Sequence, residues 1–143
     1  MKITIFNDAG QKPQLFNWDG AIDVRDLSTW FEKRKLKIPQ DLFDFYCTTG
    51  GGTIFEGETI LGPYGNKNLG DDLEGMNKYH WEKGMPKNYL IFHTGLDLTV
   101  IDMNTFEYIV LSKDYHSLSI YESLDEWYIN HLRNEYASRY GLK

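Results

Sequence analysis

The sequence predicts a single α+β domain of residues 1–143, in which a central antiparallel sheet packs against helices from both ends of the chain. Apolar residues recur at helical spacing before residue 50 and after residue 123. Between residues 89 and 111, three short runs rich in β-branched and aromatic side chains are separated by turn residues, which is typical of an antiparallel meander. A chain of 143 residues can bury roughly two thirds of the surface that it exposes when unfolded, so it needs no disulfide or metal to fold.

The first twenty residues are expected to form an N-terminal extension. Residues 2–6 alternate in polarity, which predicts an edge strand. The apolar segment at the start ends at Asp8 and is too short for the core of a signal peptide. No run approaches the roughly eighteen apolar residues of a membrane span, and Cys47 is the only cysteine. We therefore expect a soluble, cytoplasmic protein without disulfides.

The first predicted helix begins after Asp23, because aspartate is a favoured helix cap. Its apolar residues follow at i, i+3, i+6 and i+7: Val24, Leu27, Trp30 and Phe31. The basic residues between 33 and 37 lie where a helix C-terminus favours positive charge. They do not indicate nucleic-acid binding.

The second predicted helix has the clearest boundaries in the chain. Pro39 suits a first helical position, and Gly50 can adopt the left-handed conformation that ends a helix. One apolar stripe lies between them and comprises Ile38, Leu42, Phe45 and Tyr46. The three glycines 50–52 also suggest a phosphate-binding loop, but they follow a helix instead of preceding one. A helix cap and a turn are therefore the favoured interpretation.

The next elements are a strand pair near residues 53–61, a loop at residues 62–66 and a third helix. The helical stripe contains Leu69, Leu73, Met76 and His80. Glycines at 70 and 75 weaken this helix, and Gly84 with Pro86 closes it.

The second half of the chain contains the predicted meander, with strands at Tyr89–Thr94, Leu98–Asp102 and residues 106–111. A final helix begins at Ser123, which forms a capping box with Glu126. Its apolar stripe comprises Leu124, Trp127, Tyr128, His131, Leu132 and Tyr136.

The chain carries 15 basic and 21 acidic side chains, for a net charge of −6. This charge disfavours binding to nucleic acid and favours basic partners, although mild acidity also serves solubility alone. The densest acidic segment holds Asp71, Asp72 and Glu74, to which Glu56 and Glu58 could be added. We predict a partner-binding surface at these five residues; the alternative is a solvated helix start, which acidic side chains stabilise.

Catalytic and metal-binding patterns are weak. The four histidines have no metal-ligand spacing, and His80 and His131 lie on apolar helical stripes, where packed histidines are common. His131 and Glu135 lie one turn apart, yet no nucleophile can be assigned to them. Cys47 has no basic neighbour that would lower its pKa, which favours a buried, inert thiol. We assign no catalytic residue, cofactor or metal.

In the order of its elements and in several short motifs, the chain resembles the SUKH superfamily, which includes fungal cell-wall assembly regulators and many bacterial immunity proteins. The resemblance spans about residues 20–135. It lies in the proline-started helix 38–42 and its glycine exit 49–52, the strand 58–63, the strand pair 92–102 and the capped helix start 121–127.

The resemblance implies a binding protein and not an enzyme. Bacterial members bind and neutralise a cognate polymorphic toxin, often a nuclease, so the implied partner is a basic toxin domain. An acidic protein can approach such a domain by electrostatic steering. The alternative from the same family is a regulatory scaffold of the cell-wall assembly regulator type, and a small enzyme is the third hypothesis. We assign no membrane contact and no oligomeric state.

Overall fold

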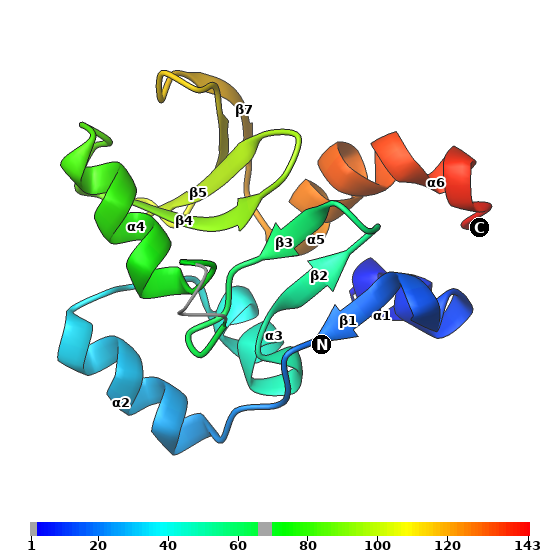
Figure 1. Ribbon diagram of the computed structural model, residues 1–143, viewed down its shortest axis with the longest axis horizontal. Coiled ribbons are helices and arrows are strands. Elements are labelled where there is room, and N and C mark those ends of the chain that lie inside the picture. Colours follow the sequence, from blue (N-terminus) through cyan, green and yellow to red (C-terminus); the bar gives the residue numbers. More distant parts are fainter. Residues whose placement is uncertain (1–2, 66–69) are drawn as a thin grey trace.

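The computed structural model describes residues 3–65 and 70–143, and it contains a seven-stranded antiparallel sheet whose strands follow the order of the sequence (Figure 1). The strands are β1 (Phe16–Trp18), β2 (Gly52–Ile54), β3 (Glu58–Ile60), β4 (Tyr89–Thr94), β5 (Leu98–Asp102), β6 (Tyr108–Leu111) and β7 (Ser117–Tyr121). The helices are α1 (Thr4–Gln11), α2 (Val24–Arg34), α3 (Gln40–Thr49), α4 (Leu73–Glu82), α5 (Leu124–Trp127) and α6 (Asn134–Tyr140). A 3₁₀ turn, η1 (Pro13–Leu15), precedes β1, and a π-helical segment, η3 (Tyr128–Arg133), joins α5 to α6. The predicted α+β class and the meander are confirmed.

Helices cover both faces of the sheet. On one face, Ile91 of β4 lies opposite Val100 of β5, and the Asn77 side chain of α4 bonds both the N–H and the C=O of Ile91. On the other face, Phe92 packs edge-on against Trp127 of α5, with ring centroids 4.8 Å apart. All five side chains are fully buried, so the core is divided between two layers of helices. Among the described residues, no helix is both long and apolar enough to cross a membrane.

The edge strand predicted at residues 2–6 is wrong: residues 4–11 form α1, and Lys2 lies outside the described residues. Tertiary contacts favour a helix over a strand at these residues. The N–H of Thr4 donates to Asp125 Oδ1 at 2.7 Å, and Asp8 is buried against Tyr128. The first twenty residues do contain an edge strand, but it is β1, whose Phe16 pairs with Ile54 of β2.

The boundaries of α2 and α3 follow their predicted caps. Asp23 Oδ1 accepts from the N–H of Arg25 at 2.9 Å, as expected of a cap. Pro39 lies one position before α3 and not at its first helical position, while Gly50 ends the helix with φ 74°. Val24 was predicted to face the core but is 59% exposed, because it lies at the solvent-facing start of α2.

Gly50 and Gly62 allow close contact among three backbone segments, those that contain Gly20, Gly50 and Gly62. A Cβ on Gly62 would lie 1.8 Å from the carbonyl oxygen of Gly50, and a Cβ on Gly50 would lie 2.1 Å from that of Gly20. The N–H of Gly50 bonds to Tyr46 O, so it is not free for an anion. The cap and turn interpretation is supported, and the glycines are required by close packing.

The second half matches the prediction except at two strands. Phe106 lies before β6, not within it, and has a left-handed backbone with φ 64°. The sequence prediction also omitted β7. The helix α4 begins at Leu73 after its cap Asp72, and Leu69 lies outside the described residues. The predicted Ser123 cap is confirmed, since Ser123 Oγ accepts from the N–H of Glu126 at 3.0 Å.

Candidate functional site

Glu58, one of the five predicted contact residues, lies in the core and is 2% exposed. Its carboxylate is 2.7 Å from His93 Nε2, and it accepts from Tyr136 Oη at 2.8 Å and from the N–H of Leu96 at 3.3 Å. Burial alone would raise the pKa of Glu58, but the hydrogen bond and charge of His93, together with the other two bonds, hold the pKa below its ordinary value. Glu58 is therefore a structural residue, and the prediction that it contacts a partner is corrected.

Asp72 is also withdrawn from the predicted contact surface. It is 4% exposed, and its side chain accepts from the N–H of Gly75 at 3.0 Å as the cap of α4. The remaining three carboxylates, those of Glu56, Asp71 and Glu74, are exposed. Asp72 is therefore part of a helix start, as the alternative interpretation held, but it is buried and not solvated.

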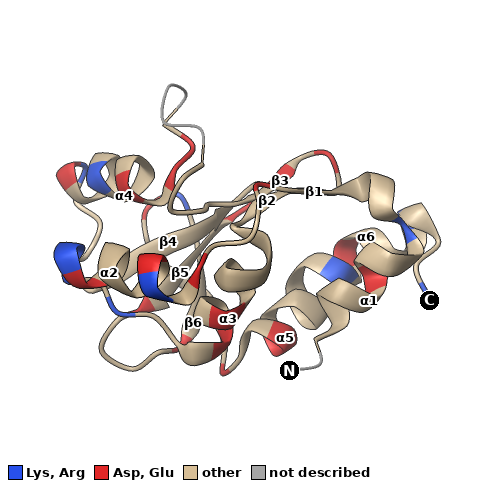
Figure 2. Ribbon diagram, turned by 90° about the horizontal axis from the view of Figure 1, so that it is seen from below, with Lys and Arg blue, Asp and Glu red and all other residues tan. Residues whose placement is uncertain are grey.

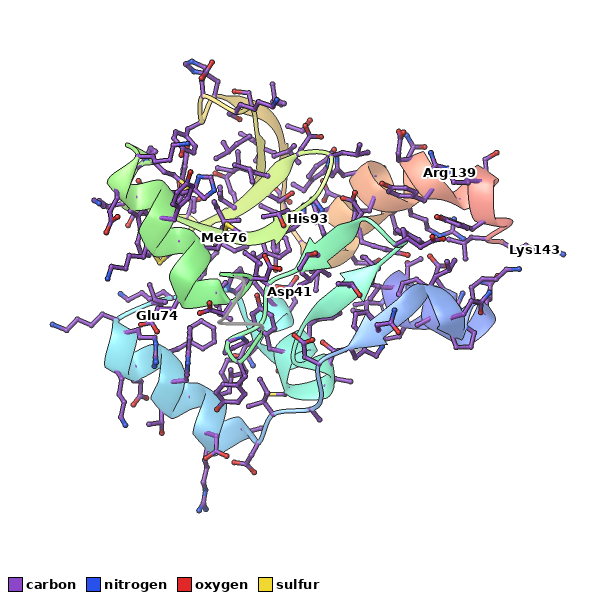
Figure 3. The ribbon with its side chains drawn as sticks, in the orientation of Figure 1. Asp41, Glu74, Met76, His93, Arg139 and Lys143 are labelled. Carbon is purple, nitrogen blue, oxygen red and sulfur yellow. The ribbon has the colours of Figure 1, made fainter. Side chains whose placement is uncertain are left out.

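The three exposed carboxylates do not form one cluster. Glu56 lies at the tip of the β2–β3 hairpin, where it accepts from Tyr140 Oη of α6. Asp71 lies beyond the opposite end of β3, next to the bridge between Gly62 and Asp72. Glu74 points from α4 toward α2, where it pairs with Arg34 Nε at 3.1 Å (Figure 3). Glu56 therefore lies apart from Asp71 and Glu74, which flank the cap Asp72 at the start of α4.

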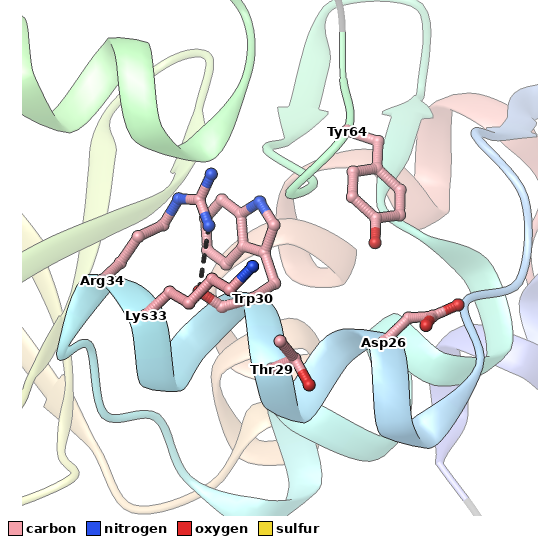
Figure 4. Close-up of a pocket in the computed structure, with 6 residues that line it drawn as sticks. All are labelled: Asp26, Thr29, Trp30, Lys33, Arg34 and Tyr64. Carbon is pink, nitrogen blue, oxygen red and sulfur yellow. Dashed lines mark hydrogen bonds between the residues drawn. The ribbon is translucent and has the colours of Figure 1, made fainter.

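A hollow of about 340 Å³ lies on α2, below the loop that holds Tyr64 (Figure 4). The Arg34 guanidinium lies over the Trp30 ring, 4.1 Å from its centroid, and Tyr64 lies across the hollow. Asp26, Thr29 and Lys33 complete its wall. Charges of both signs line this hollow, and Arg34 already pairs with Glu74, so it offers no excess of either charge.

A larger gathering of carboxylates lies where α3, α5 and β6 meet, and it is visible in Figure 2 as red segments on these elements and the adjoining loops. Asp41 joins the three elements, because its carboxylate accepts from Tyr108 Oη and from the N–H of Leu124. We call this surface the acidic face; it comprises Asp41, Asp44, Glu107, Glu122, Asp125 and Glu126. Among the described residues, none of these six carboxylates forms an ion pair.

An aromatic side chain borders the acidic face. Phe106 is 43% exposed although its backbone adopts the left-handed region, which bulky residues rarely occupy. It borders a hollow of about 510 Å³ together with Pro39, Thr105, Glu107 and Glu122. Lys37 and Phe106 together line a second hollow. Sequence reasoning missed this face because its carboxylates are spread over residues 41–126; the only signal was that two helix starts are acidic.

The buried side chains around Glu58 form a hydrogen-bond chain centred on His93. Trp127 Nε1 donates to Thr99 Oγ1 at 3.1 Å, and Thr99 Oγ1 lies 2.9 Å from His93 Nδ1. In the neutral tautomer that carries its proton on Nε2, every bond is satisfied: Thr99 donates to Nδ1, and His93 donates through Nε2 to Glu58. The connectivity resembles a hydroxyl–imidazole–carboxylate triad, but Thr99 and His93 are fully buried. No substrate can reach them in this conformation.

The other residues weighed for chemistry have structural surroundings. Cys47 is half-buried, and burial followed by the charges of Asp44 and Asp23 raises the pKa of its thiol, which disfavours a reactive thiolate. His131 lies 3.5 Å from Asp97 and not against Glu135. Within residues 3–65 and 70–143, no group of three or more His, Cys, Asp or Glu side chains could hold a metal ion.

Comparison with known families gives one match. The model of the SMI1 / KNR4 family (SUKH-1) matches residues 21–130, which include everything from α2 to the start of η3. No curated protein matches the chain in sequence.

Proposed function

Because the chain belongs to the SMI1 / KNR4 family (SUKH-1), we propose that it is an immunity protein that binds a basic toxin domain and occludes its active surface. The family membership fits a protein-interaction or immunity-like role. The more specific proposal of toxin neutralisation rests on the surface chemistry described above, and it requires no catalysis by this chain. We further propose that the complex forms in the cytoplasm.

The observation that carries the proposal is the acidic face with Phe106 at its border. Unpaired carboxylates repel one another, and a basic partner relieves this repulsion while it steers association. Interfaces are commonly centred on an aromatic anchor beside a hollow, with polar groups around it. Phe106 with its hollow and the surrounding carboxylates has this arrangement, and a toxin that binds phosphate backbones has the complementary charge.

The sequence-based placement, now reduced to Glu56, Asp71 and Glu74, is the competing location of the contact surface. Glu74 is paired with Arg34, and Glu56 lies apart from the other two. We therefore favour the acidic face. Three carboxylates can be neutralised on each surface, so each serves as the control for the other.

Where an adjacent reading frame encodes a protein with a C-terminal toxin domain, co-expression of that domain with this chain tests the proposal. We expect a stable complex that co-purifies and protects the cells from the toxin domain. A toxin domain that stays active and unbound would contradict the proposal. Recovery of cell-envelope or signalling proteins in its place would favour the regulatory scaffold.

A further inference from the structure

We propose that a hollow between the end of α4 and two turns of the sheet binds a small organic anion with an apolar body, such as a medium-chain carboxylate. The hollow measures about 370 Å³, which lies within the range of small-molecule sites. Three segments of the chain line it: the last turn of α4, the β4–β5 turn and the β6–β7 turn. This inference is independent of the proposed toxin binding.

The antiparallel order of the sheet brings these segments together. Successive turns of a meander alternate between the two ends of the sheet, so the β4–β5 and β6–β7 turns share one end (Figure 1). At this end, Leu98 of β5 pairs with Leu111 of β6. The end of α4 reaches the β6–β7 turn, where Tyr115 Oη lies 2.8 Å from His80 Nδ1. The β5–β6 turn, which holds Phe106, lies at the other end of these strands. The hollow is therefore separate from the one beside Phe106.

Leucine side chains form the apolar part of the hollow. Leu96 lies in the β4–β5 turn and is 63% exposed, so it is free to contact a ligand. Leu98 and Leu111 also line the hollow, and as register partners they point to the same face of the sheet. An apolar body that covers these side chains is removed from water together with them, which favours binding.

Positive charge exceeds negative charge in the lining. Lys83 and Lys113 both line the hollow, and neither forms an ion pair with any described residue. Lys83 Nζ lies instead 3.4 Å from Tyr79 Oη. The lining carboxylate of Asp97 lies 3.5 Å from His131 Nε2, on the helical segment η3. Two ammonium groups against one carboxylate favour an anionic ligand, although the protein as a whole is acidic.

His80 adds a directional donor to the two ammonium groups. When Tyr115 donates to Nδ1, His80 carries its proton on Nε2 and can donate it to an anion. The carbonyls of His80 and Trp81 already accept from the N–H groups of residues 83–85, so the end of α4 does not present them to the ligand. Ammonium and imidazole donors therefore match a carboxylate head, and the leucines match its apolar body.

The test titrates octanoate into the full chain at neutral pH and follows it by heteronuclear NMR. We expect saturable shifts at Leu96, Lys113 and Tyr115, with a Kd on the order of 1 mM, because so small a ligand makes few contacts. Acetate lacks the apolar body and octylammonium has the opposite charge, so each should bind at these residues at least about tenfold more weakly. Equal binding of octylammonium there, or no saturation by octanoate up to about 20 mM, would overturn the proposal.

Two double variants test the role of the lysines. Lys83→Gln with Lys113→Gln removes both ammonium groups and should weaken octanoate binding at least about fivefold. The matched control, Lys37→Gln with Lys78→Gln, removes two exposed lysines that do not line this hollow and should change the Kd by less than about twofold. Circular dichroism verifies that both variants fold. Equal affinities of the two double variants would overturn the proposal.

The apolar part is tested separately. Leu96→Ser should weaken the binding of octanoate, whereas Val24→Ser, at a similarly exposed residue of α2, should not. A Leu96→Ser protein that binds octanoate like the wild type would overturn the proposed contact with the apolar body. N-acetyl-leucyl-leucine tests a peptide carboxyl terminus as the ligand. If it bound at least about tenfold more tightly than octanoate, the assignment to a small organic acid would be overturned.

Discussion

Glu58 of β3 and His93 of β4 form a fully buried hydrogen bond, with 2.7 Å between Oε1 and Nε2. The two residues are 35 positions apart, and their bond fastens the hairpin of β2 and β3 to the rest of the sheet. Replacing Glu58 with Ala leaves His93, Tyr136 and the Leu96 amide without their acceptor. We expect a loss of about 3 kcal/mol in the free energy of unfolding, measured by urea denaturation. Glu56→Gln, two residues earlier but exposed, should change it by less than about 0.5 kcal/mol.

Gly95 lies against the same carboxylate, and a Cβ there would lie 2.2 Å from Glu58 Oε1. Gly95→Ala should therefore destabilise the wild type, because three hydrogen bonds hold that carboxylate in place. In a Glu58→Ala background, which vacates the space, the added cost should largely vanish. A double-mutant cycle in which the two losses simply add would show that the clash does not occur.

The backbone crossing after α3 predicts opposite outcomes for two glycines. Gly62→Ala would force backbone atoms apart, and we expect it to cost at least about 2 kcal/mol. Gly10 lies in α1, where a Cβ would have no atom within 4 Å, so Gly10→Ala should stabilise by roughly 0.5–1 kcal/mol. Thermal unfolding of both variants measures the difference, and the account fails here if Gly62→Ala unfolds at the temperature of the wild type.

The N-terminal extension is expected to contribute to stability although the family match begins after it. Asp8 is fully buried and accepts from Tyr128 Oη at 2.7 Å and from Arg133 Nε at 2.8 Å. Asp8→Ala leaves both donors without that acceptor and should cost about 3 kcal/mol in a denaturation experiment. Tyr128→Phe removes one bond and should cost about 1 kcal/mol. Equal losses for the two variants would mean that Arg133 contributes nothing.

Stability should decrease below neutral pH. Burial, followed by the charge of His93, lowers the pKa of His131, although Asp97, Glu58 and Glu135 oppose this shift. The unfolded chain therefore binds more protons than the folded chain below about pH 6.5, and the free energy of unfolding must fall as the pH falls. Burial and then the charge of Lys83 lower the pKa of His80, so His80 also makes the free energy of unfolding fall as the pH falls. His131→Gln should reduce the slope of stability between pH 6.5 and 5, and an unchanged slope would contradict the shift.

Local sequence signals determined most of the fold. The caps at Asp23 and Ser123 and the glycine after α3 each act within one turn, so they could be recognised without tertiary information. The first residues were mispredicted because Thr4 and Asp8 obtain their partners from residues 120 or more positions away. β7 was missed because its apolar side chains face solvent and give no signature of a buried strand.

The candidate site was predicted less well for a related reason. A run of carboxylates in sequence indicated Asp71, Asp72 and Glu74, but a cap turns Asp72 inward and Glu74 pairs with Arg34. Glu58 could not be recognised as buried, because the side chains that donate hydrogen bonds to its carboxylate come from β4 and α6. Conversely, the acidic face is assembled only when α3, β6 and α5 meet at Asp41.

The central claim is that the acidic face binds a basic toxin domain. Isothermal titration with the toxin domain of the neighbouring reading frame, at about 150 mM salt, compares two variants that each lose three negative charges. The first, Asp44→Asn with Glu107→Gln and Glu126→Gln, neutralises the acidic face; the second, Glu56→Gln with Asp71→Asn and Glu74→Gln, neutralises the competing surface. We predict that the first variant binds at least about tenfold more weakly than the wild type and that the second binds within about threefold. Weaker binding by the second variant alone, or unchanged binding by the first, would contradict the account.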